Sequence, residues 1–229
     1  MVRGAHPLDL RKDGVIVFKK TKFIKISLTM TQSTGNITAK DLWEQAWHQI
    51  LTAASTQKSS FATPVIANHT LSAAPRIRTV VLRKAIRETA SLYCYTDLRS
   101  TKVEQLSSYP TLSWLFWDSE SGIQFTGSGP TSWLPRKEAR EIFDRLPKHS
   151  RKAYATTLAP ATPLRQADDG LPKDWNDRTL SATDYAGQHF GVLVTQLERA
   201  EVLRLDRDGN LRLSARRTGE RWELQWMVP

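Results

Sequence analysis

Two short segments carry the residues whose types and spacing could do chemistry. The first runs from Arg78 to Arg83, with a cation at each end. Between them lie Thr79, Val80, Val81 and Leu82. The second, residues 95–102 (Tyr-Thr-Asp-Leu-Arg-Ser-Thr-Lys), leaves a predicted strand and enters a predicted helix. A buried strand rarely holds an arginine at each end unless anions lie there. A helix N-terminus presents unpaired N–H groups and the positive end of the helix dipole to an anion. The two segments therefore indicate an anion site.

Lys102 lies in the first turn of this helix, where a cation is unfavourable for the helix dipole. A bound anion would explain its position. Arg78, Lys102 and the hydroxyls of Thr96 and Ser100 could together neutralise a phosphate dianion. From spacing alone, an ordinary solvated strand end followed by a capped helix explains these residues equally well.

The rest of the chain predicts a mainly β fold of the α+β class with helices inserted. A helix is expected over residues 39–55, because Thr38 is a good N-cap and Asp41 meets the free backbone N–H groups. Its apolar stripe includes Trp43 and Trp47, which we expect to dock on the core. The alternation of apolar residues predicts strands over 62–69, 76–85, 91–96, 111–117, 123–127, 188–206, 211–216 and 222–227. Shorter helices are expected over 99–107, 135–145 and 148–158, and a long irregular loop over 159–183. Strands joined by short turns favour an antiparallel barrel over a doubly wound sheet.

Composition narrows the classes of function. Cys94 is the only cysteine, so neither an intramolecular disulfide nor a thiolate metal site is expected, and a cytoplasmic location fits. No apolar run reaches the roughly 18 residues of a membrane span. Half of the net charge of +10 lies in residues 1–29, which we expect to be a disordered basic extension preceding a domain over 30–229. The five histidines show no metal-ligand spacing, so no metal is expected.

The two anion-site segments resemble the FMN-binding core of the pyridoxamine 5′-phosphate oxidase family. Gln124, in Gly-Ile-Gln-Phe-Thr-Gly, extends the resemblance. Toward the end of the chain, Ala200-Glu-Val-Leu, Leu211-Arg-Leu-Ser-Ala-Arg216 and the closing Trp-Met-Val-Pro are similar to the last strands of that family. The resemblance covers residues 61–229.

The resemblance implies an antiparallel split β-barrel of six or more strands with flanking helices. It also implies a homodimer with FMN at the subunit interface, where Trp114, Trp117 and Trp133 offer apolar area. The implied cofactor-binding residues are Arg78, Thr79, Val80, Val81, Leu82, Arg83, Tyr95, Thr96, Ser100, Thr101, Lys102, Gln124 and Arg216. Arg78, Thr96, Thr101 and Lys102 would belong to the phosphate and ribityl end, and Arg83, Gln124 and Arg216 would lie near the ring or the substrate. The implied substrate contacts are Arg83, Ser150 and Arg212.

The sequence also departs from the family pattern. Thr101 stands where the family has a phosphate-binding arginine, and Arg83 stands where it has a lysine. The tyrosine and arginine that hold the substrate phosphate align near Ile142 and Leu146, with Arg145 adjacent. Further departures are Leu203 for a tryptophan, Ser214 for a histidine and Ala215 for an aspartate. The chain therefore resembles a separate branch of the family rather than the authentic oxidase, and its substrate is not predicted.

Three functions remain open on the sequence. The first is an FMN-dependent oxidoreductase, either an oxidase or a reductase, for which no catalytic side chain is nominated because the flavin carries the electron chemistry. The second is a non-catalytic binder of FMN, another phosphorylated ligand or haem. The third, a nucleic-acid-associated protein that uses the basic extension, is the weakest, because the other residues are only mildly basic.

Overall fold

The computed structural model describes residues 37–70 and 74–229, and the extension predicted over 1–29 lies outside them. Helix α1 (Ala39–Thr56) begins where the sequence predicts. Thr38 accepts from the backbone N–H of Asp41, and the Asp41 carboxylate accepts from the backbone N–H of Thr38, which completes a capping box. Trp43 and Trp47 are buried on its inner side, so the predicted docking face is confirmed.

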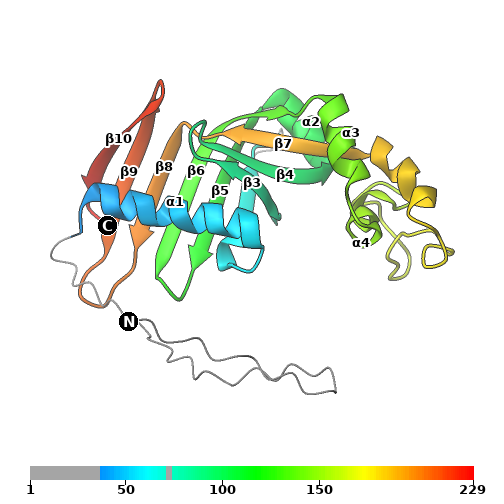
Figure 1. Ribbon diagram of the computed structural model, residues 1–229, viewed down its shortest axis with the longest axis horizontal. Helices are drawn as coiled ribbons and strands as arrows, with labels where there is room; N and C mark the ends of the chain where they lie inside the picture. The colour runs from blue at the N-terminus through cyan, green and yellow to red at the C-terminus, as the bar shows by residue number, and fades with distance from the viewer. Residues whose placement is uncertain (1–36, 71–73) are drawn as a thin grey trace, which may run out of the picture. The chain divides into compact units, whose positions relative to one another are not determined.

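The described residues form two antiparallel sheets that share strand β6 (Figure 1). The strands are β1 (Val65–Asn68), β2 (Arg76–Thr79), β3 (Leu82–Ile86), β4 (Ser91–Asp97), β5 (Thr111–Asp118), β6 (Ile123–Trp133), β7 (Phe190–Gln196), β8 (Arg199–Arg204), β9 (Leu211–Thr218) and β10 (Arg221–Met227). The large sheet has the order β10-β9-β8-β6-β5-β1-β2, and β3, β4, β7 and the end of β6 form the second. The predicted mainly β split barrel is confirmed.

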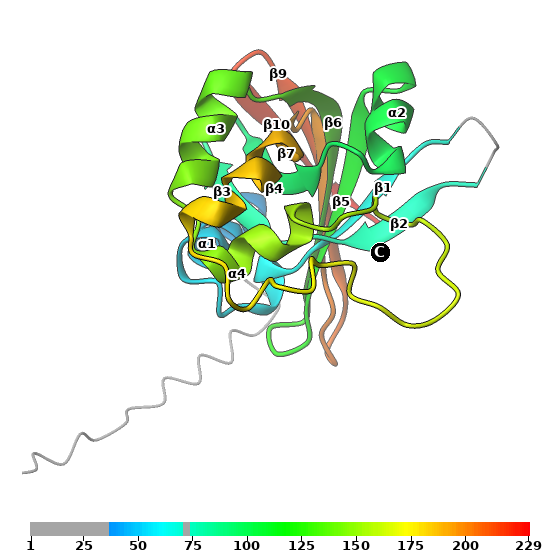
Figure 2. The same ribbon diagram turned by 90° about the vertical axis from the view of Figure 1, so that its right-hand side faces the viewer.

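Helices cover this barrel on several sides (Figures 1 and 2). They are α2 (Thr101–Ser108), α3 (Arg136–Asp144) and α4 (Lys148–Arg151), with short 3-10 turns over Ser60–Ala62, Lys152–Tyr154 and Ser181–Gln188. Helix α1 crosses one face of the large sheet and buries its tryptophans there against Phe125 and Trp222. A second apolar cluster, around Phe143 and Phe190, lies between α3 and β7.

Two predicted strands are each divided in the structure. Residues 76–85 form β2 and β3, and these belong to different sheets. At the break, the N–H of Val80 donates to the carbonyl of Pro64 at 2.9 Å, so the chain leaves the ladder of β2 before it starts β3. Residues 188–206 form β7 and β8, because the N–H of Leu197 turns to the carbonyl of Ala90 at 2.9 Å. The single strands predicted over 76–85 and 188–206 are therefore wrong.

Two smaller predictions also need correction. The helix expected over 148–158 ends at Arg151 and continues only as a 3-10 turn. The guanidinium of Arg151 draws the chain inward there, because it donates to the carbonyls of Asp144 and Leu146 and pairs with Asp184 at 2.6 Å. Trp114, proposed as interface area, is only 1% exposed and lies in the core.

The face of the large sheet opposite α1, which we call the outer face, is ordered in rows of directly opposed residues. One row contains Ile77, Ala67, Ser113, Ser128, Arg199, Arg216 and Glu223. The next contains Thr79, Val65, Leu115, Thr126, Glu201, Ser214 and Gln225. The third contains Trp117, Gln124, Leu203, Arg212 and Met227. In these rows the side chains on β1, β2 and β5 are mostly apolar, and all the charged ones lie on β8, β9 and β10.

Within residues 37–70 and 74–229, no helix is long and apolar enough to cross a membrane.

Candidate functional site

The end of β4 and the start of α2 bring together three residues of the predicted phosphate site. The ammonium group of Lys102 donates hydrogen bonds to the hydroxyl of Thr96 and, at 3.2 Å, to the hydroxyl of Ser100. Ser100 is the N-cap of α2, yet its side chain bonds no backbone N–H of the helix. The first N–H groups of a helix have no acceptor within it, so this end of α2 presents donors and a cation together.

Two cations crowd this position. Burial lowers the pKa of Lys102 from its ordinary value, and the charge of Arg78 lowers that pKa further. Burial also lowers the pKa of the Arg78 guanidinium, with a smaller contribution from Arg76. Over the described part of the chain, no carboxylate forms an ion pair with Arg78 or Lys102. A bound dianion would compensate both charges, which is the arrangement that a phosphate monoester requires.

An ion pair and its hydrogen bonds fix the loop between β4 and α2. The guanidinium of Arg99 pairs with the buried carboxylate of Asp97 at 2.7 Å and donates to the carbonyl of Thr156 at 2.9 Å. The backbone N–H of Arg99 donates to the same carboxylate at 2.8 Å. The loop is therefore fixed both to itself and to the chain after Tyr154. Arg99 falls within the helix expected over 99–107, so its position along the chain did not indicate this role.

Arg83 lies in a separate cleft between the second sheet and α3. Its guanidinium lies 5.0 Å from the centre of the Tyr95 ring, and its buried Nε has no hydrogen-bond partner among the described residues. The cleft has a volume of about 420 Å³. It is lined by Arg83, Lys84, Tyr93, Tyr95, Leu134, Glu138, Glu141, Ile142, Arg145 and Val192. Three cations and two tyrosine rings suit a small planar anion, although two carboxylates restrict where its charge can lie.

The thiol of Cys94 lies near Lys102 and Arg83 but is not a nucleophile at neutral pH. Burial raises the pKa of Cys94 to about 12, even though the charges of Lys102 and Arg83 oppose this shift. A nucleophilic cysteine requires the thiolate. Cys94 therefore does not supply a nucleophile to the site.

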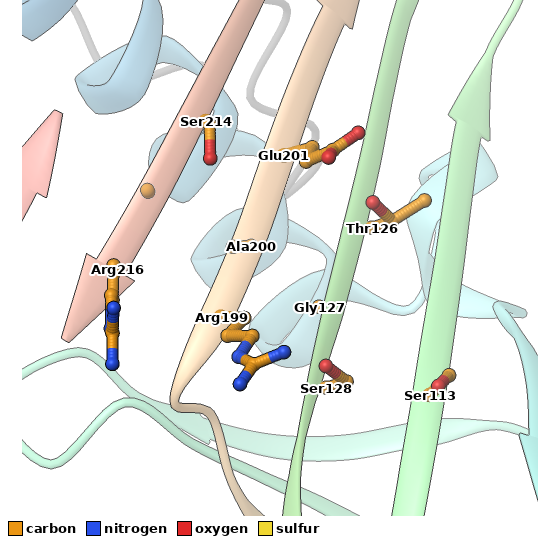
Figure 3. Close-up of a pocket in the computed structure, with 10 residues that line it drawn as sticks. Ser113, Thr126, Gly127, Ser128, Arg199, Ala200, Glu201, Ser214 and Arg216 are labelled. Atoms are coloured by element: carbon orange, nitrogen blue, oxygen red, sulfur yellow. The ribbon is translucent and has the colours of Figure 1, made fainter. Parts of the chain in front are cut away.

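Gln124, Arg212 and Arg216 lie on the outer face, where Figure 3 shows Arg216. Gln124 stands between Trp117 and Leu203 in its row, and Arg216 lies on β9, where its side chain is exposed. Arg212 pairs with Glu201 at 2.8 Å. Arg78, in contrast, lies opposite the buried Ile66 and thus on the other side of the large sheet.

One chain therefore brings together Arg78, Thr96, Ser100 and Lys102, and it places Arg83 and Tyr95 in the neighbouring cleft. Thr101 is exposed at the start of α2. Gln124, Arg212 and Arg216 are not assembled with either group. Ser150 does not line the Arg83 cleft, whereas Arg145 does.

The comparisons with known proteins agree with this geometry. Residues 41–134 match the family model for the FMN-binding domain of pyridoxamine 5′-phosphate oxidase. A pyridoxamine 5′-phosphate oxidase-related, FMN-binding protein from Nostoc punctiforme has a similar structure, with a TM-score of 0.63 and 17% identity over 82% of this chain and 97% of that one. PhzG from Burkholderia lata, solved with tetrahydrophenazine-1-carboxylic acid, gives a TM-score of 0.62 and 16% identity over 82% of this chain and 92% of its own. No curated protein matches the sequence. The resemblance predicted from the sequence is confirmed: residues 41–134 match this family model, and the fold is similar to that of the two solved structures.

Proposed function

Because residues 41–134 match an FMN-binding domain and the fold is the split barrel of that family, we propose that this protein is an FMN-dependent oxidoreductase. The observation that carries the proposal is the pair of half-buried cations Arg78 and Lys102, which form no ion pair with a carboxylate among the described residues. Two partly desolvated cations side by side are unfavourable, and the phosphate of FMN would offset their repulsion. The FMN-binding domain would extend over residues 30–229, and the protein would work in the cytoplasm.

The residues present fit the parts of FMN. Lys102, Arg78, Thr96 and Ser100 would hold the phosphate, with Thr79, Thr101 and the segment Val80–Leu82 beside the ribityl chain. Gln124 would contact the ring edge, because a side-chain amide can both donate and accept hydrogen bonds. Arg216 would contribute near the ring.

The site would be complete only in a homodimer. Arg78 and Gln124 lie on opposite faces of the large sheet, so one copy would supply the residues that hold the phosphate and a second copy those at the ring. The exposed apolar end of the outer face supports this arrangement, since Ile77 is 67% exposed and Trp117 is 42% exposed. Such side chains are typical of the buried centre of an interface.

FMN supplies reversible electron transfer when bound. The chain's own residues would orient the ring, hold the substrate and exclude water. The cleft at Arg83 and Arg145 is where we place the anionic group of the substrate. PhzG, which has a similar fold, was solved in complex with tetrahydrophenazine-1-carboxylic acid, and this supports a ring-containing carboxylate as the substrate.

A non-catalytic binder of FMN, another phosphorylated ligand or haem is the second candidate. The apolar Ile142 in the cleft favours it, because the related oxidase has a polar substrate contact near this position.

One experiment separates the proposals. The purified protein is denatured, and the released ligand is identified by its absorbance and mass. FMN at about one per chain supports the cofactor assignment, whereas haem or no ligand after incubation with excess FMN contradicts it. Turnover of bound FMN with a nicotinamide reductant and oxygen then distinguishes an enzyme from a binder.

A further inference from the structure

Arg199 and Arg216 lie directly opposite each other on β8 and β9. Both side chains are exposed on the outer face, and Ser128 continues the row on β6 (Figure 3). Opposed like charges on neighbouring strands are destabilising. Over residues 37–70 and 74–229, neither guanidinium forms a hydrogen bond or an ion pair that would offset this repulsion. The pair is thus suited to an anion from outside.

The nearby carboxylates do not neutralise the pair. Glu201 lies in the next row and is paired with Arg212 at 2.8 Å. Glu223 stands opposite Arg216 on β10, but the two form no ion pair. Glu198 precedes Arg199 in the chain and lies on the rim of the adjacent hollow. These carboxylates surround the arginines and limit the anion to one that fits between them.

The backbone around Arg199 is held firmly. The N–H of Glu198 donates to the carbonyl of Ser128, and the N–H of Arg217 donates to the carbonyl of Glu198, each at 2.9 Å. Gly129 permits this close approach, since a Cβ at that position would lie 1.9 Å from the carbonyl oxygen of Gln196. The backbone that carries the two arginines is therefore fixed, so anion binding would order only their side chains.

Two hollows meet at this pair. One is an open groove of about 340 Å³ lined by Ser113, Thr126, Gly127, Ser128, Arg199, Ala200, Glu201, Ser214, Ala215 and Arg216 (Figure 3). The other, of about 300 Å³, is lined by Gln196, Glu198, Arg199, Arg216, Arg217 and Gly219. The floor of the groove is the strand backbone at Gly127, Ala200 and Ala215, and the hydroxyl groups of Ser113, Thr126, Ser128 and Ser214 line it. Its volume falls within the range of small-ligand sites.

We propose that Arg199 and Arg216 form a recognition site for the carboxylate or phosphate group of a small molecule other than FMN. The rest of that molecule would lie along the hydroxyl-lined groove toward Ser113. The site shares Arg216 with the proposed flavin site, and it rests on that function in no other respect. A nucleic acid is not the expected ligand, because Glu201 and Glu223 would repel the phosphates that flank a bound one.

The test uses pyrophosphate as the probe, titrated calorimetrically into the full-length protein saturated with FMN at low ionic strength. Arg199→Gln is expected to weaken pyrophosphate binding at least tenfold. Arg207→Gln, which removes the same charge from an exposed position, is expected to change it less than twofold. In the double variant Arg199→Gln/Arg216→Gln, the fold-loss of pyrophosphate affinity should be smaller than the product of the two single fold-losses, because one anion engages both side chains.

Three outcomes would overturn the proposal. The first is that the wild-type protein fails to bind pyrophosphate. The second is that Arg199→Gln binds pyrophosphate as tightly as wild type does. The third is that Arg199→Gln lowers the affinity for FMN as much as the affinity for pyrophosphate. The third would mean that the FMN phosphate occupies the site. If the protein does not bind FMN at all, the same titration without FMN still tests the arginine pair, and only the proposed function fails.

Discussion

The positive charge of Arg78 lowers the pKa of the Lys102 ammonium, which burial has already lowered. The two residues come from β2 and α2, and no described carboxylate pairs with either. The charge of Lys102 therefore has opposite effects on the stability of the empty protein and of the protein with a bound anion. It is unfavourable in the empty protein and favourable once an anion is bound.

Replacement of Lys102 by methionine should therefore weaken FMN binding without destabilising the empty protein. Loss of one charge-assisted phosphate contact should cost about 1.5–3 kcal/mol of binding free energy. The melting temperature of the FMN-free variant should equal or exceed that of wild type. Fluorescence titration and thermal unfolding give the two measurements. Riboflavin, which lacks the phosphate, is the matched ligand, and its affinity should not change. An equal loss of riboflavin affinity would show that Lys102 acts through the fold.

The affinity for FMN should also depend on pH at alkaline values. The pKa of Lys102 in the empty protein lies below its ordinary value of 10.5, and a bound dianion raises it. Protonated Lys102 favours binding, so affinity should fall as pH rises through the lowered pKa. On the acid side, affinity should rise as the phosphate loses its second proton near about pH 6. Lys102→Met should abolish the alkaline fall and leave the acid side unchanged. An alkaline fall of the same size in the variant would assign it to another group.

The ion pair of Asp97 and Arg99 should be important for stability. Asp97→Asn leaves a largely buried guanidinium without its carboxylate, and Arg99 is about one-fifth exposed. We expect a loss of about 2–3 kcal/mol of unfolding free energy, somewhat less than for a fully buried pair. Urea unfolding measures this loss. In the double variant Asp97→Asn/Arg99→Met, the loss should be smaller than the sum of the two single losses. Strictly additive losses would show that the pair is not coupled.

The proximity of Thr96, Ser100 and Lys102 could be predicted from the sequence because these residues are local to one another. Thr96, Ser100 and Lys102 lie within seven positions, so a strand followed by a helix necessarily brings them close. The fold class was predictable for a similar reason, since the period-two pattern survives in most strands.

The outer face could not be predicted from the same pattern. Alternation shows which residues share a face of one strand, but it does not show the register between strands. The opposition of Arg199 and Arg216 depends on the divided strand at Leu197 and on the close approach at Gly129. Whether Arg145 lines the cleft could not be predicted either, because its position depends on where α3 ends.

A homodimer is expected, and Trp117 should lie in its interface. Trp117→Lys places a charge among the exposed apolar residues of the outer face, where burial without a partner is costly. Sedimentation at micromolar concentration should show a dimer for wild type and a shift toward monomer for the variant. FMN affinity should fall with the dimer, because Gln124 is the neighbour of Trp117. Leu164→Lys, in the irregular loop, is the control and should remain dimeric. A monomeric wild type that still binds FMN tightly would contradict the composite site.

Pyridoxamine 5′-phosphate should be a poor substrate. A substrate phosphate needs several charge-assisted donors, each worth about 1.5–3 kcal/mol, and about 1.4 kcal/mol corresponds to a tenfold change in rate. The cleft presents Ile142 where the related oxidase has a donor, and Ser214 replaces the histidine of the closing motif. Arg83 and Arg145 remain, so the cleft should still accept a smaller anion such as a carboxylate.

The assay supplies pyridoxamine 5′-phosphate to the FMN-loaded protein and follows pyridoxal 5′-phosphate and hydrogen peroxide. We expect a kcat/KM several powers of ten below the value of about 10⁴ M⁻¹s⁻¹ at the lower end for ordinary enzymes. Arg145→Gln should hardly alter that residual rate, but it should weaken inhibition by an aromatic carboxylate such as benzoate if the cleft binds its anionic group. Turnover within about tenfold of the ordinary value would restore the oxidase reaction and show that Arg145 replaces the missing donors.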